Sequence, residues 1–243
     1  MDAQATWPAA SERTGGRQSG RAETIYRSIF DAVVDQRLPP GAKLTEEQLG
    51  ALFSASRTLV RSALQALAHD HIVTIERNRG AFVSAPTIAD AQDIFFSRRI
   101  VESGIAPEVA RKIQPDDVAR LRALLADEGA AIRRDDRQSA IRLSGAFHMT
   151  IARIGGEGAL TRFLGGLISR SSLVIALYGR GAAPTCAREE HSGIVDALAA
   201  HQGTRAATLM AEHLQHIFGG LVLEARPDPA IDLAAVLRVP GTR

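Results

Sequence analysis

The sequence has little cysteine, few aromatic residues and no long apolar segment. Its single cysteine, Cys186, excludes an internal disulfide framework and a zinc site built from cysteines alone. No apolar run approaches the roughly 20 residues that span a bilayer. The first residues lack the apolar core of a signal peptide. We therefore expect a soluble, cytoplasmic protein without a membrane partner.

The composition is that of a globular protein with a bias toward helices. Hydrophobic residues make up 45% of the 243 residues and charged residues 23%, so the chain can bury a core. Aromatic residues reach only 5%, whereas alanine and leucine are frequent, which favours helices. The formal net charge of +2 is too small to indicate a nucleic-acid partner by itself.

Four segments are expected along the chain. Residues 1–20 are small and polar around an isolated Trp7 and predict a disordered tail. Residues 21–86 mix helical periodicity with β-prone runs, and residues 87–225 are helical in pattern throughout. Three prolines in residues 226–243 predict a C-terminal tail.

The pattern of residues 21–86 predicts three helices and a hairpin. Apolar residues recur every four positions from Ile25, and residues 39–41, Pro-Pro-Gly, end that first helix. Thr45 resembles the start of a capping box for a second helix, and Ser56 is a suitable N-cap for a third.

The hairpin completes a recognisable arrangement. Two β-prone runs, residues 72–76 and 81–84, flank a turn at residues 78–80. Three helices with a two-stranded wing form a winged helix-turn-helix, in which the third helix can enter a DNA major groove.

Cations gather at the start of the third helix and at the tip of the wing. Arg57 and Arg61 lie four residues apart on one side of the expected helix. An arginine fork can bind guanine O6 and N7, or a phosphate. The alternative is that these arginines are only solvated charges. The predicted DNA-binding residues are Ser56, Arg57, Thr58, Arg61, Arg77, Arg79 and Gly80.

The C-terminal part predicts six helices and contains three histidines of interest. Gly104 and Pro107 interrupt the first helix, and we expect a kink or a restart at Pro107. Converging imidazoles from His148, His191 and His213 could bind a divalent metal, although their spacing matches no short motif and each could be an ordinary polar residue. The expected helices span residues 87–112, 116–134, 137–154, 157–178, 185–201 and 203–225.

Four stretches of the N-terminal part match a known family pattern: LPPGAKL at residues 38–44, EQL at 47–49, SRTLVRSAL at 56–64 and RGAFV at 79–83. Through them, residues 24–84 resemble the DNA-binding domain of the GntR superfamily of bacterial transcription regulators. The chain departs from the family pattern at Ala55, Leu59 and His71. His71 replaces a usual glycine at a helix-to-strand turn, where histidine adopts the left-handed conformation at some cost.

Four stretches of the C-terminal part also match a family pattern: RRIVE at residues 98–102, FHMTIA at 147–152, EHSGIVDAL at 190–198 and MAEHL at 210–214. Through them, residues 90–223 resemble the helical FCD ligand-binding domain of the FadR branch of these regulators. The resemblance implies a mainly α protein: an N-terminal winged helix-turn-helix and a C-terminal all-helical antiparallel bundle that supplies the dimer contact.

The resemblance also implies a metal centre. In that family three histidines and an aspartate hold a metal, and a carboxylate effector completes the site. The histidines correspond to His148, His191 and His213, but the aspartate position is Ser144. Because serine removes one negative charge, we expect a three-histidine site for Zn²⁺ or Ni²⁺ in which Ser144 is at most an outer-shell partner. Ser144 and Arg98 are the residues expected to bind the effector. In the alternative, metal binding is lost and the histidines hydrogen-bond the effector.

Each of the other polar residues near these motifs has two possible roles. Arg98 and Glu102 can form an ion pair on one helix. The resemblance implies instead that Arg98 faces the cavity and holds an anionic effector. His216 could compete for the metal or support the site. Glu190 or Glu212 could orient an imidazole or be exposed.

We expect a transcription regulator that is not an enzyme. A homodimer would bind double-stranded operator DNA, and a small organic acid would change its affinity. The resemblance suggests a repressor. Two other functions were weighed: a metal-dependent hydrolase with Glu190 as general base, and a protein-interaction adaptor. The sequence contains neither HExxH nor a nucleophile elbow, and a hydrolase would leave the winged unit without a purpose.

Overall fold

The computed structural model describes residues 17–35, 37–179, 185–222 and 233–237. The chain divides into two compact units. The winged unit comprises residues 17–86 together with the short helix near the C-terminus, and the helical unit comprises most of residues 87–222. Most of the expected N-terminal tail, with Trp7, lies outside the described residues. None of the helices in the described ranges is long and apolar enough to cross a membrane.

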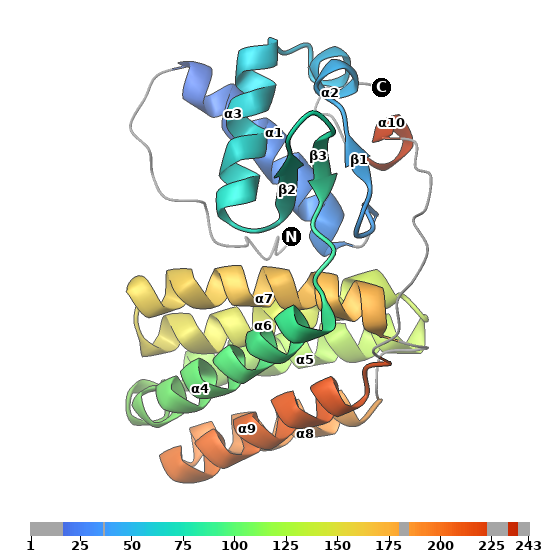
Figure 1. Ribbon diagram of the computed structural model, residues 1–243. Helices are drawn as coiled ribbons and strands as arrows, with labels where there is room; N and C mark the ends of the chain where they lie inside the picture. The colour runs from blue at the N-terminus through green and yellow to red at the C-terminus, as the bar shows by residue number, and fades with distance from the viewer. Residues whose placement is uncertain (1–16, 36, 180–184, 223–232, 238–243) are drawn as a thin grey trace. The chain divides into compact units, whose positions relative to one another are not determined.

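The winged unit has the predicted order of helices followed by a hairpin (Figure 1). Its apolar helix faces are buried, including Ile25 and Ile29 of the first helix and Val60 and Leu64 of the third. The elements are α1 (Arg17–Val34), β1 (Lys43–Leu44), α2 (Glu46–Leu52), α3 (Arg57–His69), β2 (Val73–Glu76) and β3 (Gly80–Val83).

The expected two-stranded wing is instead part of a three-stranded sheet. Its order is β1-β3-β2, and β1 pairs antiparallel with β3, so that Lys43 faces Phe82 and Leu44 faces Ala81. A strand of two residues is too short to produce an alternating pattern, so its sequence gave no signal for it. The first helix also differs from the expectation, because α1 already begins at Arg17.

Side-chain caps fix both helices of the helix-turn-helix. The Thr45 hydroxyl accepts from the Gln48 amide nitrogen at 3.3 Å and donates to the Gln48 side chain at 2.7 Å. The Ser56 hydroxyl accepts from the Leu59 amide nitrogen at the start of α3. Beyond the end of α3, His71 has a φ of +57°, the left-handed conformation expected at this turn.

A short helix from the far end of the sequence belongs to the winged unit. We expected residues 226–243 to be a tail, yet α10 (Leu233–Val236) contacts α2. Leu233 and Leu237 lie four residues apart and are 3% and 4% exposed. Arg37 donates a hydrogen bond to the Val236 carbonyl. These two leucines form the apolar face of a helix, a signal that was missed because the prolines of this segment predicted a tail.

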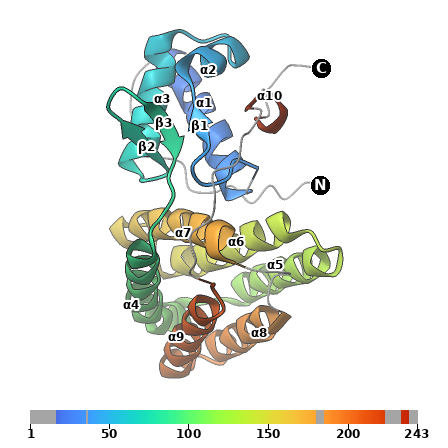
Figure 2. The ribbon, with the colours of Figure 1, turned by 45° about the vertical axis from the view of Figure 1, so that its right-hand side comes forward.

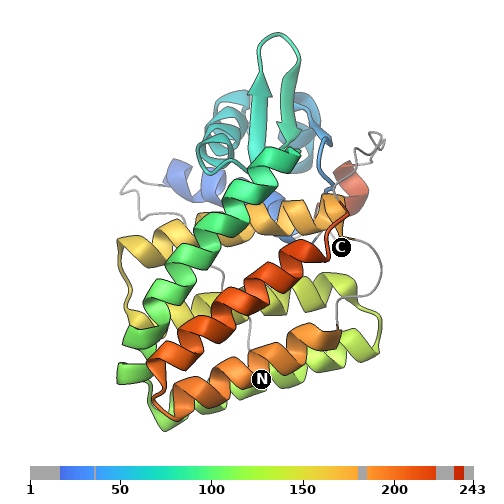
Figure 3. The ribbon, with the colours of Figure 1, turned by 60° about the horizontal axis from the view of Figure 1, so that its bottom comes forward.

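The helical unit contains the six helices that were predicted, shown from two further directions in Figures 2 and 3. They are α4 (Ile88–Lys112), α5 (Pro115–Arg133), α6 (Arg137–Gly155), α7 (Ala159–Tyr178), α8 (Thr185–Ala199) and α9 (Gly203–Gly219). Five of them contact one another in a closed ring, in the order α4, α9, α8, α5, α6 and back to α4. Phe147, Leu121 and Met210 belong to the apolar core inside this ring.

Two helices of this unit differ from the expectation. Helix α4 continues through Pro107 and does not restart there. The start of α9 lies against this point, since a Cβ on Gly203 would come within 2.9 Å of the Pro107 Cα. Glycine therefore permits the close approach of these two helices. Helix α9 ends at Gly219, well before residue 225.

Candidate functional site

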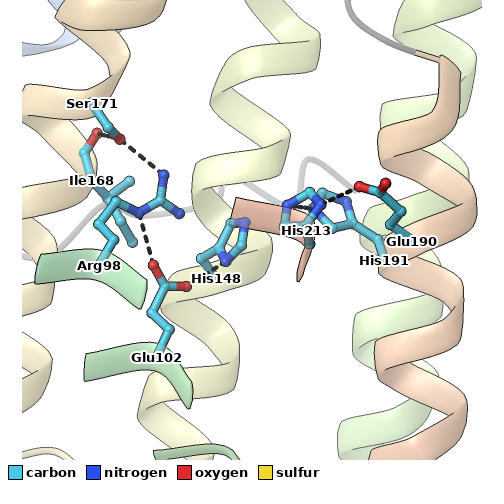
Figure 4. Close-up of polar contacts among 8 residues, drawn as sticks. All are labelled: Arg98, Glu102, His148, Ile168, Ser171, Glu190, His191 and His213. Atoms are coloured by element: carbon cyan, nitrogen blue, oxygen red, sulfur yellow. Dashed lines mark hydrogen bonds and ion pairs between the residues drawn. The ribbon is translucent and has the colours of Figure 1, made fainter. Parts of the chain in front are cut away.

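Three histidines converge inside the helical unit (Figure 4). His148 extends from α6, His191 from α8 and His213 from α9, and each is at most 1% exposed. One ring nitrogen of each lies within 4.8 Å of the other two. The Nε2 atoms of His191 and His213 are 2.9 Å apart. Packing of the ring thus brings together residues that no local motif connects.

Each of the three imidazoles faces a glutamate through its Nδ1 atom. The distances are 2.5 Å from His148 to Glu102, 3.0 Å from His191 to Glu128 and 2.8 Å from His213 to Glu190. A carboxylate in this position accepts the Nδ1 proton and leaves the Nε2 lone pair available. The glutamates therefore assign one tautomer to all three rings.

The donor set fits a divalent metal ion. In the assigned tautomer, the His191 and His213 lone pairs meet at 2.9 Å with no proton between them. The Nε2 atom of His148 is buried and has no hydrogen-bond partner among the described residues. Nitrogen ligands at about 2.0–2.1 Å from a tetrahedral zinc ion lie roughly 3.3 Å apart. A cation would satisfy all three nitrogens, and imidazole suits Zn²⁺ and Ni²⁺.

Burial keeps two of these imidazoles in their neutral form. It lowers the pKa of His148 to about 4 and that of His213 to about 3, although Glu102 and Glu190 oppose the change. Both rings are neutral at physiological pH, and the neutral imidazole is the form that ligates a metal.

A buried ion pair adjoins the histidines. Arg98 and Glu102 are each 3% exposed, and the Arg98 Nε atom donates to Glu102 at 2.7 Å. Burial alone would raise the pKa of Glu102, but the Arg98 charge and the contact with His148 lower it to about 2. Arg98 also donates to the Ser171 hydroxyl, while its Nη2 atom has no partner within the described ranges. The ion pair between Arg98 and Glu102 is therefore present, and the Arg98 Nη2 atom remains available as a buried hydrogen-bond donor.

The two glutamates Glu102 and Glu128 were not anticipated as partners of histidines. Glu128 lies on the side of α5 that buries Leu121 and Leu125, at helical spacing. A charged residue on an apolar helix face was the signal that could have identified it. Glu102 occupies an equivalent position on α4, one turn from the buried Ala106.

The remaining candidates near the site have separate positions. Glu190 accepts from both His213 and His216, whereas Glu212 is exposed. The His216 side chain is 66% exposed, outside the buried cluster. Ser144 lies one helical turn before His148 and is partly buried.

The candidate DNA-binding residues are exposed on the winged unit. Arg57, Thr58 and Arg61 lie in the first turns of α3, where Ser56 is the exposed N-cap residue. Nε and Nη2 of Arg61 each donate to a different oxygen of Glu46 on α2, both at 2.8 Å.

The tip of the wing also presents cations. Arg77 is exposed, and Arg79 pairs with Glu76 while its guanidinium lies 5.3 Å from the Phe82 ring centroid. Gly80 has a φ of +105°, which closes the turn before β3.

Family models match both units. Residues 21–83 match the bacterial regulatory proteins of the gntR family, and residues 93–216 match the FCD domain. A helix-turn-helix transcriptional regulator from an unstable DNA locus of Streptomyces ambofaciens is 29% identical over 95% of this chain and 97% of its own length. The transcriptional repressor RspR of Escherichia coli is 25% identical over 80% of this chain and 86% of its own.

Solved structures agree with these matches. A GntR transcriptional regulator from Rhodococcus sp. RHA1 superposes with a TM-score of 0.74 and 25% identity, covering 82% of this chain and 96% of its own. McbR/YncC of Escherichia coli gives a TM-score of 0.72 at 20% identity, over 82% of this chain and 95% of its own, which supports the fold.

Removing Arg98 should destabilise the protein strongly. In an Arg98→Met variant the Glu102 carboxylate stays buried without its cation, which we expect to cost about 3–5 kcal/mol of unfolding free energy. Urea denaturation followed by circular dichroism, with a chelator present, measures the loss. Arg111→Met is the matched control: it breaks an exposed pair with Glu108 and should change stability little, because water screens both charges. Equal losses in both variants would contradict the assigned role of the buried pair.

Proposed function

Because the chain belongs to the gntR family of bacterial regulatory proteins and carries their FCD domain, it is a DNA-binding transcription regulator, and we propose that it is a repressor controlled by a small organic acid at a metal site. The observation that carries the metal site is the convergence of three buried Nε2 atoms whose Nδ1 atoms are fixed by glutamates. RspR, a relative over most of its length, is itself named a repressor.

The site would hold Zn²⁺ or Ni²⁺ through His148, His191 and His213. A bound divalent ion supplies positive charge and open coordination positions for a carboxylate. Ser144 adds no negative charge here, so an anionic ligand meets less repulsion than beside an aspartate. The unpartnered Nη2 atom of Arg98 offers a further donor for an acidic effector.

The hydrolase alternative receives no support from the site. Its general base would be Glu190, but that carboxylate accepts hydrogen bonds from His213 and His216. A base engaged by two imidazoles is poorly placed to activate water. Operator binding, in contrast, gives the winged unit a purpose and implies a cytoplasmic location.

We further propose that two copies of the chain bind one operator. A dimer places two recognition helices on a pseudo-palindromic site. Val101 of α4 packs against a buried cluster that Leu164 of α7 shares with Met149 of α6. Helices α4 and α7 also expose large apolar side chains that are more than half accessible, which a second copy would cover. They are Phe96 and Ile100 on α4 and Leu160 and Phe163 on α7.

Metal content tests the histidine site directly. The untagged protein should contain about one Zn²⁺ or Ni²⁺ per chain by elemental analysis after supply of either ion. A triple variant with alanine at positions 148, 191 and 213 should contain none, because all three ligands are lost. His216→Ala is the matched control and should keep its metal, since that histidine lies outside the buried cluster. Metal retained by the triple variant, or absent from the native protein, would overturn this site.

The same preparations test the effector. Acetate, succinate and citrate serve as probes, each titrated into a complex with a duplex that the native protein selects from a randomised pool. Release of DNA from the native protein, but not from the triple variant, is the expected result, because a ligand acts only through differential affinity for two states. Release by none of these acids, or equal release from both proteins, would contradict an organic-acid effector at the metal.

A charge on the exposed apolar surface should separate the dimer. In Ile100→Glu combined with Phe163→Glu, two carboxylates would be buried at the contact, which is unfavourable without partners. Sedimentation velocity should show monomers for this variant and dimers for the native chain. Ile75→Glu changes an isoleucine of the wing that is 50% exposed and should leave the dimer intact. A variant that still sediments as a dimer would place the contact elsewhere.

Loss of Arg57 should weaken DNA binding without affecting the fold. Arg57→Ala removes a fork that can contact a base edge or a phosphate, so we expect affinity for the selected duplex to fall at least about tenfold. A gel-shift titration at fixed salt measures this change. Arg111→Ala removes one exposed cation from the helical unit and should have little effect. Unchanged affinity in Arg57→Ala would remove the assignment of α3 as the recognition helix.

A further inference from the structure

The ion pair between Arg61 and Glu46 lies on the surface that is expected to meet DNA. The Arg61 side chain is 62% exposed, and that of Glu46 is 33% exposed. The hydrogen bonds from Arg61 lower the pKa of Glu46, so its carboxylate is ionised at neutral pH. An exposed pair of this kind contributes little to stability, because water screens both charges. Its main physical effect is to fix the direction of the guanidinium.

The contact uses one of the two hydrogen-bonding edges of Arg61. A guanidinium can donate in pairs from its Nε and Nη2 atoms or from its Nη1 and Nη2 atoms. Glu46 takes the first edge, with both distances at 2.8 Å. The second edge still carries paired N–H donors, and such a pair matches guanine O6 and N7.

We propose that Glu46 is a positioning residue that sets DNA sequence specificity by holding Arg61 so that its Nη1–Nη2 edge reads guanine. This inference rests on the proposed role of α3 as the recognition helix. Glu46 lies at the start of α2 and Arg61 on α3, so the pair joins the two helices of the helix-turn-helix.

Two effects of the carboxylate raise specificity. First, its negative charge offsets that of Arg61, which weakens the sequence-independent attraction to phosphates. Second, the pair fixes the arginine rotamer before DNA arrives, so less side-chain freedom is lost when a base is bound. Directional hydrogen bonding to guanine is retained, whereas nonspecific binding is reduced.

Glu47 provides a matched control within the same helix. It is the next residue of α2, it also lies in the first turn, and it is exposed. Glu46→Gln and Glu47→Gln therefore remove the same charge from nearly the same place and have similar effects on the helix dipole. Only the first substitution removes the charge that holds Arg61.

The experiment compares the full-length native protein with both variants on two duplexes. One is the duplex selected by the native protein, and the other is a scrambled sequence of equal composition. For Glu46→Gln we expect tighter binding to the scrambled duplex, weaker binding to the selected one, and a fall of about tenfold in the ratio of affinities. Glu47→Gln should shift both affinities together, because it changes only the long-range charge. A renewed selection with Glu46→Gln should lose preference at one guanine.

Arg61→Ala and the Arg61→Ala, Glu46→Gln double variant complete a mutant cycle. The proposal requires that Glu46→Gln has no further effect on the ratio once Arg61 is absent. Equal ratios for Glu46→Gln and Glu47→Gln, with unchanged melting temperatures, would overturn it. A different result is that Arg61→Ala leaves the ratio of affinities unchanged while Arg57→Ala weakens binding. That result would contradict the recognition of guanine by Arg61 but would still support α3 as the recognition helix. If both arginine variants bind normally, the proposed recognition helix itself fails.

Discussion

Glu102 and Glu128 are each only 3% exposed, in a helical interior that is otherwise largely apolar. A buried carboxylate is costly unless donors or cations surround it. Here the donors are imidazole Nδ1 groups, assisted at Glu102 by Arg98. Because the carboxylates occupy the Nδ1 atoms, the Nε2 atoms are left to face one another. The requirement to satisfy buried charge thus determines which face of each histidine is available.

The same contacts connect every helix of the ring. Helix α4 supplies Glu102, α5 supplies Glu128, and α6, α8 and α9 supply the histidines. A ligand at this centre therefore acts on all five helices together. Helix α4 also follows β3 along the chain after a connection of only a few residues. The proposed effector control requires that the ligand prefers one of two states of the protein.

Periodicity and caps made much of the fold predictable. The apolar repeats beginning at Ile25 and the caps at Thr45 and Ser56 are local signals, and the corresponding helices are present. Elements that depend on tertiary contacts gave weaker signals. The strand at Lys43 exists only through its pairing with β3, and the continuity of α4 at Pro107 accompanies its packing against Gly203.

The histidines of the site could be named from the sequence, but their glutamate partners could not. Glu128 lies 63 positions from His191 along the chain, and Glu102 lies 46 positions from His148. No spacing rule connects residues on different helices. The pairing follows from the order in which the helices form the ring, which is a property of packing.

The docking of α10 gives the winged unit an unusual order of assembly. Leu233 and Leu237 are buried in this unit, yet they follow the whole helical unit in the sequence. Domains generally fold as they emerge from the ribosome, at about 5–20 residues per second. The surface that receives these leucines therefore stays uncovered for roughly 8–30 s after Pro86 has been synthesised. A nascent chain thus completes its helical unit before its winged unit.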